Sequence, residues 1–274
     1  MNRFLTNPST DEKNIRLYGS SPYRIAVIHG GPGGPGEMKS VAEELSKECG
    51  VLEPLQTAHS MEGQILELKE MLEQQAVPPV ILIGHSWGAW LSYLYAARYP
   101  GDVKKLILVS SPGFESSAGE KTLEERLSRL SEVERERMKT LLSELGHPDE
   151  SANTKFLELA ILAAKADAFD PLLYTNDLLE AQFDIYQSVW KEAEHLRANG
   201  ELLELGKKIL CPTVALHGDH DPHPAQSVQE PLSRILSHFR CIPIKNCGHR
   251  PWIERQARDE FYRILKEEIH LRTS

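Results

Sequence analysis

The chain has 274 residues, of which 41% are hydrophobic and 26% are charged. This is the composition of an ordinary globular protein, and the length allows one good core with an insertion, or two small domains. No apolar run reaches the roughly 18 residues of a membrane-spanning helix, and the first eight residues lack the apolar segment of a signal peptide. We therefore expect a cytoplasmic protein with no membrane partner.

The formal net charge of −9 is concentrated in one part of the chain. Residues 116–205 contain 19 Asp and Glu against 10 Lys and Arg, whereas the rest of the chain has 21 of each. An acidic surface disfavours nucleic acid as a partner. Two interpretations of the acidic region remain open: a solvated helical surface, or a lid whose charge attracts cationic substrates such as peptides with a free amino terminus.

The four cysteines do not form a C-x-x-C pair. Cys49, Cys211, Cys241 and Cys247 are scattered in or beside predicted strands. We therefore expect buried free thiols rather than disulfides or a metal site.

The first 110 residues alternate short runs of Val, Ile and Leu with amphipathic segments. This alternation is typical of a parallel sheet with helices on both faces. The predicted strands are 24–28, 51–52, 80–83 and 103–109, and the predicted helices are 37–48, 61–75 and 87–99.

The alternation stops after residue 111, and the sequence then reads as helical as far as residue 206. Thr122 to Glu125 predict a capping box at the start of a helix that carries Leu127, Leu130 and Val133, and further helices are expected at 153–166 and 177–197. Strands at 212–217 and 239–244 and helices at 225–237 and 252–269 follow. We predict an α/β core domain of residues 1–111 and 207–274, into which a helical cap domain, residues 112–206, is inserted.

The most informative motif is Gly84-His85-Ser86-Trp87-Gly88, which reads G-x-S-x-G. Such a turn is so tight that glycine is needed two residues before and after the serine. The motif alone is weak evidence, but here an apolar strand precedes it and a helical pattern follows it, which is the context that a nucleophile elbow requires. Ser86 is therefore a candidate nucleophile, and a purely structural Gly/Ser turn is the alternative.

A serine nucleophile needs a base within hydrogen-bond reach and a third group that orients the base. These groups must lie at the same sheet edge, where the carboxyl ends of parallel strands meet. The predicted strand 212–217 leads into Gly218-Asp219-His220-Asp221-Pro222, and the strand 239–244 leads into Gly248-His249. His249 is the candidate base, although a histidine packed under the last helix would look the same.

Four motifs together resemble the α/β-hydrolase fold family. They are H-G-G-P-G-G at residues 29–34, G-H-S-W-G-A at 84–89, H-G-D-H-D-P at 217–222 and G-H at 248–249. The order Ser, Asp, His, with a helical insertion before the acid, is also that of the family. The resemblance implies that Ser86 is the nucleophile, His249 the general base and acid, and Asp221 the carboxylate that orients His249. Asp221 is preferred to Asp219 because it has the family's G-x-x-D spacing.

Acyl transfer also needs donors for the oxyanion. One is the backbone N–H of Trp87 at the start of a helix, and the resemblance implies that Gly31 supplies the other. The alternatives are glycines that only permit a tight turn, or a phosphate-binding loop, although no G-x-x-x-x-G-K is present.

The cluster His217, Asp219, His220, Asp221 and His223 also suggests a metal site. Its spacing does not match a known ligand pattern. We predict neither a metal nor a cofactor.

Residues 29–34 look most similar to the proline iminopeptidase (prolyl aminopeptidase) branch of the family. That branch usually has Gly or Gln where this chain has His85, and an Asp-x-Arg-Gly segment that residues 50–57 lack. Residues 190–194 are the candidate region for glutamates that hold a substrate's amino terminus.

We predict a serine hydrolase that cleaves a small-molecule carboxylic ester, amide or short peptide through an acyl-enzyme. The alternatives are an iminopeptidase-type aminopeptidase, a non-catalytic ligand-binding protein of the same fold, and a different chemistry at the same triad, such as carbon–carbon bond hydrolysis or perhydrolysis. The sequence leaves the oligomeric state open.

Overall fold

A computed structural model describes residues 14–116, 118–172 and 181–271. Its centre is a seven-stranded sheet in the order β1-β3-β2-β4-β5-β6-β7. All neighbouring strands are parallel except β1, which runs antiparallel to β3 at one edge. The strands are β1 Ile15–Tyr18, β2 Tyr23–Ile28, β3 Gly50–Pro54, β4 Val80–His85, β5 Val103–Val109, β6 Thr213–Gly218 and β7 Phe239–Ile244.

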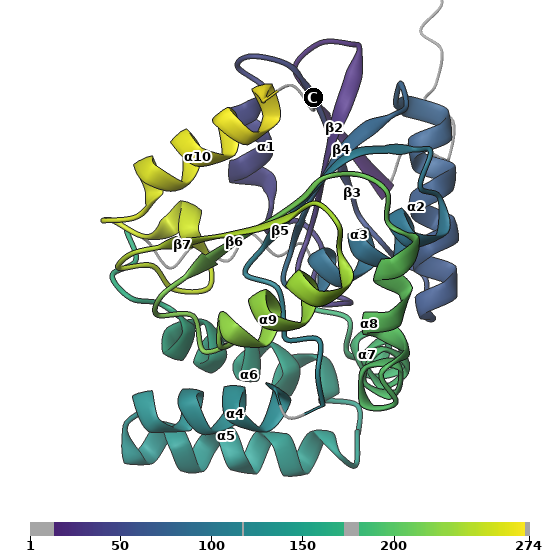
Figure 1. Ribbon diagram of the computed structural model, residues 1–274. Helices are drawn as coiled ribbons and strands as arrows, with labels where there is room; N and C mark the ends of the chain where they lie inside the picture. Colours follow the sequence, from purple (N-terminus) through teal and green to yellow (C-terminus); the bar gives the residue numbers. More distant parts are fainter. Residues whose placement is uncertain (1–13, 117, 173–180, 272–274) are drawn as a thin grey trace, which may run out of the picture.

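Helices cover both faces of the sheet, as the alternating sequence predicts (Figure 1). On one face α1 (Lys39–Leu45) and α10 (Arg258–His270) bury a core against β2, β4 and β5. On the other face α2 (Met61–Gln75), α3 (Trp87–Arg98) and α9 (Gln226–Ile235) form a second core. Every residue of α3 from Trp87 to Ala97 is buried, which fixes the helix that follows Ser86.

Between β5 and β6 the described residues are helical. We call residues 112–206 the inserted segment. Its helices α4, α5 and α6 lie beyond one end of the sheet (Figure 1) and share a small core of Leu130, Met138 and Ala166. Helix α7 instead packs into the core that α2, α3 and α9 form on the sheet. The helices are α4 Ala118–Arg129, α5 Glu132–Leu145, α6 Ala152–Asp167, α7 Phe183–Ala198 and α8 Glu201–Glu204, followed by a 3₁₀ turn, Leu205–Lys208.

The predicted capping box at Thr122 is wrong. Helix α4 begins at Ala118, so Thr122 lies inside it, and its hydroxyl donates to the carbonyl of Ala118. Thr can bond to the preceding turn in this way without ending a helix. The true capping box starts α5, where Ser131 and Glu134 cap each other.

Other boundaries differ from the predictions for local reasons. The last helix begins at Arg258 rather than at residue 252, because residues 251–253 form a separate 3₁₀ turn. Strand β1 was not predicted, since a half-exposed edge strand has little apolar pattern. Part of the helix predicted at 177–197, residues 177–180, lies outside the described residues.

The four cysteines are free thiols, as predicted, but only Cys247 is fully buried and the other three are partly exposed. No helix in the described ranges has the length and apolarity that crossing a membrane demands.

We predict that Gly88→Ala destabilises the fold. A Cβ at Gly88 would lie 2.3 Å from the carbonyl oxygen of Ile28 and 2.5 Å from that of His29, and backbone atoms of a central strand cannot move aside easily. We expect a loss of about 3 kcal/mol in the free energy of unfolding, measured by urea denaturation. Gly101→Ala is the matched control, because a Cβ there meets nothing within 4 Å. Equal stability of the two variants would contradict the close packing of the turn.

Candidate active site

Ser86 lies in a strained turn between β4 and α3. Its backbone has φ 50° and ψ −118°, a conformation that residues other than glycine rarely adopt. A Cβ at Gly84 would lie 2.1 Å from the carbonyl oxygen of Gly88, so the inner side of the turn has no room for a side chain. Between residues 80 and 97 Ser86 is the only residue that is not buried. The turn therefore exposes part of Ser86, whereas the strand before it and the helix after it are buried.

Asp221 and His249 come together on the loops that follow β6 and β7. The Nδ1 atom of His249 donates to Oδ2 of Asp221 at 2.9 Å, and the Asp221 side chain is completely buried. The other oxygen of Asp221 accepts from the backbone N–H and the ring Nδ1 of His223, both at 2.9 Å. Asp219 instead accepts from the backbone N–H of Cys247 at 3.2 Å. Asp221, and not Asp219, is thus the acid that contacts His249.

Burial and neighbouring charges shift the pKa values of Asp221 and His249 in opposite directions. Burial alone would raise the pKa of Asp221, but the facing His249, His217 and His223 hold that pKa well below its ordinary value. Burial would likewise lower the pKa of His249, and the charge and hydrogen bond of Asp221 outweigh it, so that this pKa is raised. An ionised acid therefore makes His249 a better base than a free imidazole.

The main chain of His249 is bound on both sides. Its N–H donates to the carbonyl of Asp167, at the end of α6, at 2.9 Å. Its carbonyl lies 2.9 Å from Nε2 of His85, the residue before Ser86. The loop of the candidate base thus contacts both the inserted segment and the turn that carries Ser86.

Glu254 is a buried carboxylate that the sequence analysis missed. It accepts from the N–H of Gly248 at 3.1 Å, and from the N–H groups of Phe169 at 2.9 Å and Asp170 at 2.7 Å. It therefore joins the loop of His249 to the chain just after α6. The only signal in the sequence was an acid five residues after the candidate histidine.

The glycine-rich loop after β2 lies against Ser86. A Cβ at Gly30 would be 3.1 Å from the Cβ of Ser86, whereas a Cβ at Gly31 would meet nothing within 4 Å. Within the described ranges, neither the N–H of Gly31 nor that of Trp87 donates to a protein acceptor. Both predicted oxyanion donors are therefore available to a ligand, and Gly31 borders open space.

The inserted segment contributes aromatic and charged side chains near this region. In α7, Tyr186 stacks on Trp190 with ring centroids 6.1 Å apart, and Trp190 stacks on Trp90 of α3 at 5.5 Å. In α4, Arg126 donates to both carboxylate oxygens of Asp167 at 2.7 Å, so its charge is paired. None of these side chains was singled out as a site residue from the sequence, except that Trp190 lies in the region 190–194.

One group in the described part of the chain could bind a metal ion. Asp221, His223 and His249 each offer one ligand atom, and these atoms lie within 4.8 Å of one another. However, the Asp221 carboxylate already hydrogen-bonds to Nδ1 of both histidines, so a metal would have to replace both bonds.

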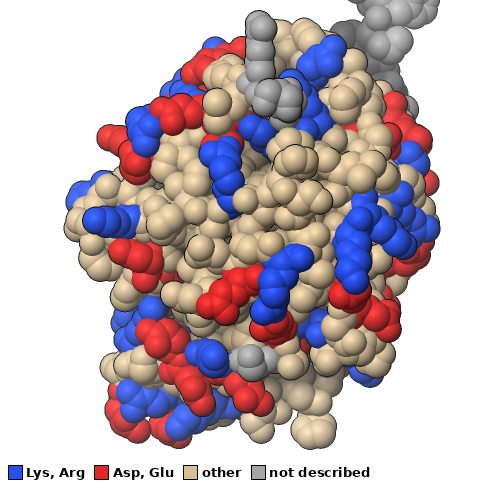
Figure 2. Space-filling model, viewed as in Figure 1, with Lys and Arg blue, Asp and Glu red and all other residues tan. Residues whose placement is uncertain are grey.

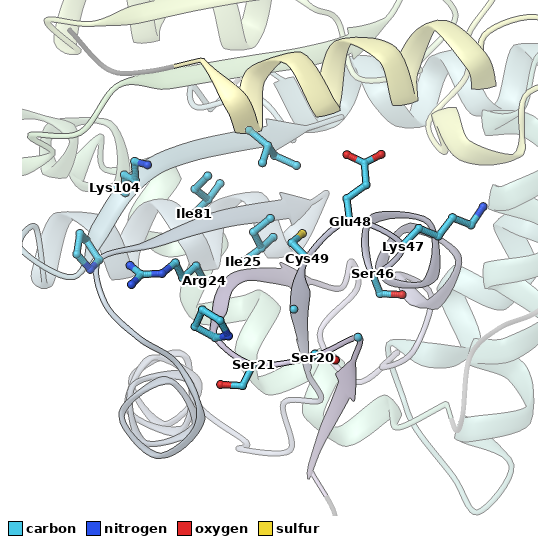
Figure 3. Close-up of a pocket in the computed structure, with 15 residues that line it drawn as sticks. Ser20, Ser21, Arg24, Ile25, Ser46, Lys47, Glu48, Cys49, Ile81 and Lys104 are labelled. Atoms are coloured by element: carbon cyan, nitrogen blue, oxygen red, sulfur yellow. The ribbon is translucent and has the colours of Figure 1, made fainter.

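A cavity of about 590 Å³ lies elsewhere (Figure 3). It is lined by residues at the amino ends of β2, β4 and β5, including Arg24, Ile81 and Lys104. Ser86 follows the opposite, carboxyl end of β4. The cavity is therefore separate from the site of Ser86, Asp221 and His249.

Comparison with known proteins identifies the family of the chain. The sequence profile described as the alpha/beta hydrolase family matches residues 25–264. The chain belongs to this family. It is a hydrolase whose resemblance to the proline iminopeptidase branch is confirmed by its relatives. The proline iminopeptidase of Lactobacillus delbrueckii subsp. bulgaricus is 23% identical over 89% of this chain and 90% of its own length.

The chain is also similar to proteins with other names. Lipase 1 of Psychrobacter immobilis is 32% identical, over 36% of this chain and 35% of its own length. Among solved structures, VinJ superposes with a TM-score of 0.68 at 18% identity, and the match covers 94% of this chain and 95% of VinJ. At this identity the structural likeness shows the fold and not the substrate.

We predict that Asp221 sets the titration of His249. In the wild type His249 should titrate above the ordinary value of 6.5, and in Asp221→Asn its midpoint should move to lower pH, because the neutral amide no longer stabilises the imidazolium. Imidazole NMR titration measures both midpoints. Asp219→Asn is the control, since that acid does not contact His249. A midpoint that is unchanged in Asp221→Asn would show that the pair does not interact as described.

Proposed function

We propose that the protein is a serine hydrolase in which Ser86 is the nucleophile, His249 the general base and acid, and Asp221 the carboxylate that orients His249. The observation that carries this proposal is the buried hydrogen bond between His249 and Asp221, at the sheet edge where β4 delivers Ser86 in a strained turn. The substrate is a small-molecule carboxylic ester, an amide or a short peptide.

The reaction runs through an acyl-enzyme. Ser86 Oγ attacks the substrate carbonyl and gives its proton to His249 Nε2, while the N–H groups of Gly31 and Trp87 donate to the oxyanion. The C–O or C–N bond breaks as His249 returns the proton to the leaving group. A water molecule, deprotonated by His249, then attacks the ester of Ser86, and the acid is released as the acyl–Oγ bond breaks and His249 returns the proton to Ser86 Oγ. Among the described residues Ser86 Oγ makes no hydrogen bond, so in the proposed reaction its hydrogen bond to His249 Nε2 forms when substrate binds.

We also propose that the inserted segment is the lid of this site. Two contacts support this role. The N–H of Gln182 donates to the carbonyl of Gly33 at 2.9 Å, and the carbonyl of Asp167 binds the N–H of His249. The lid thus meets both the glycine-rich loop and the loop of the base, and it supplies Tyr186 and Trp190 as apolar surface.

The charge of the inserted segment supports a solvated surface rather than an attractor of cationic substrates. On the face in Figure 2 acidic and basic side chains alternate over the region of α4 and α5. Several form ion pairs, such as Arg137 with Glu158 and Lys165 with Glu134. Ion pairing leaves the excess of acidic side chains in the segment unchanged, but salt screens exposed charges over about 8 Å, so this excess acts mainly at the surface.

The glutamates in residues 190–194, the candidate region for binding a substrate's amino terminus, already have partners within the protein. Glu192 accepts from the N–H of Met61 at 2.8 Å, and Glu194 pairs with Arg197. These contacts favour esters and simple amides over the aminopeptidase alternative, which rests on the similarity to proline iminopeptidases.

We predict that Ser86→Ala reduces kcat on p-nitrophenyl esters by at least about 10⁴-fold, because no nucleophile remains. A fluorophosphonate should label the wild type at Ser86 and leave the variant unlabelled. Ser92→Ala is the matched control, because Ser92 is fully buried in α3 and its hydroxyl has no hydrogen-bond partner among the described residues. A wild type that folds but is neither labelled nor active would favour a non-catalytic binding protein.

A substrate panel tests the aminopeptidase alternative. We expect short acyl esters to be hydrolysed with a kcat/KM at least about 10-fold above that for proline arylamide, because the glutamates of α7 are engaged and give little support to a substrate ammonium. The panel compares proline and other aminoacyl arylamides with short and long acyl esters. Activity on proline arylamide alone would establish the aminopeptidase instead.

A further inference from the structure

His85 occupies the variable position before the nucleophile, and its side chain is almost completely buried, with 2% exposed. Its ring lies between those of His249 and Trp252, with both centroid separations at 4.7 Å. A histidine at this position has no role in the reaction proposed above. Its contacts therefore require a separate explanation.

Both ring nitrogens of His85 face acceptors. Nδ1 lies 2.5 Å from Oε1 of Glu37, and Nε2 lies 2.9 Å from the carbonyl oxygen of His249. A carbonyl oxygen can only accept, so Nε2 must carry a proton. The contact between Nδ1 and Oε1 of Glu37 holds one further proton. The geometry thus describes a buried imidazole hydrogen-bonded through both nitrogens, to Glu37 and to the main chain of His249.

Glu37 links this pair to the glycine-rich loop. The same oxygen, Oε1, accepts from the N–H of Gly30 at 2.5 Å. Burial alone would raise the pKa of Glu37, but the charge and hydrogen bond of His85, the charge of Arg250 and the N–H of Gly30 lower it to about 2. Glu37 is therefore ionised at neutral pH.

We propose that Glu37 and His85 form a positioning pair, which sets the main chain of Gly30 and of His249 relative to Ser86. This inference rests on the proposed function. The ring of His85 packs on the ring of His249, but neither Glu37 nor His85 hydrogen-bonds to the side chain of Ser86, Asp221 or His249 among the described residues. One hydrogen-bonded chain, from Gly30 through Glu37 and His85 to the carbonyl of His249, connects the oxyanion loop, the nucleophile turn and the base loop.

Three variants test the pair. Glu37→Gln removes the charge and keeps an acceptor for Gly30, His85→Phe keeps a ring without donors, and His85→Gln keeps an N–H for the carbonyl of His249. We expect kcat on the best ester to fall about 10- to 100-fold in Glu37→Gln and His85→Phe with KM within about twofold, because misplaced groups slow the chemical step rather than binding. His85→Gln should recover part of the loss. The double variant Glu37→Gln/His85→Phe should be no slower than the slower single one.

Glu268→Gln is the matched control, because Glu268 forms an equally buried ion pair with Lys105 far along the sheet from Ser86. It should lower the midpoint of thermal unfolding and leave kcat unchanged. Folded Glu37→Gln and His85→Phe proteins with the wild-type kcat would overturn the positioning pair.

A measurement on the wild type covers the case in which these variants fail to fold. Long-range ¹H–¹⁵N spectra, with His85 assigned through its contact with the Trp252 ring, should show a proton on Nε2, because the carbonyl of His249 can only accept. A His85 ring that carries its proton on Nδ1 alone would overturn the pair. The proposed function fails separately, since it requires Ser86 of the wild type to be labelled by a fluorophosphonate.

Discussion

The close approach of backbone atoms at the turn between β4 and α3 is the constraint on which the rest of the site depends. Gly84 lies against Gly88, and Gly88 against the end of β2, each at a distance that leaves no space for a methyl group. The turn closes with Ser86 at a positive φ, at a cost of about 1–3 kcal/mol. The burial of α3 offsets this cost. Its four largest side chains, Trp87, Trp90, Tyr93 and Tyr95, are fully buried, and burial of one large apolar side chain contributes about 2 kcal/mol.

The sequence was sufficient to predict the parts of the site that depend on local pattern and on topology. The strand, the glycine spacing and the helix around Ser86 are adjacent in the chain, so the turn could be recognised from a dozen residues. The loops that carry Asp221 and His249 were predicted to meet because parallel strands end at one edge, and the structure brings these two side chains into contact. The choice of Asp221 over Asp219 came from family spacing, and in the structure Asp219 contacts the N–H of Cys247.

The groups that the sequence did not reveal act across long separations. Glu37 contacts His85, Asp167 contacts His249 and Glu254 contacts Phe169, pairs that lie 48, 82 and 85 residues apart. Glu37 and Glu254 are ordinary acids in their own segments, and Asp167 uses its main-chain carbonyl, so only the tertiary structure brings these acceptors to an imidazole or an N–H group. The misplaced capping box at Thr122 has a similar origin: two neighbouring segments fit the same four-residue pattern, and helix packing selected Ser131.

Buried carboxylates therefore do more than serve the proposed chemistry. Asp221 accepts a hydrogen bond from His249, Glu37 binds Gly30 and His85, and Glu254 binds Gly248 together with the chain after α6. The pKa values of Asp221 and Glu37 are depressed in the fold. A depressed pKa contributes stability that is present above the unfolded value near 4 and is lost as the pH falls towards the folded value. The same acids that organise the site thus make the loops around Ser86 sensitive to acid, and those loops should loosen together, because they share the hydrogen-bonded chain through His85 and the main chain of His249.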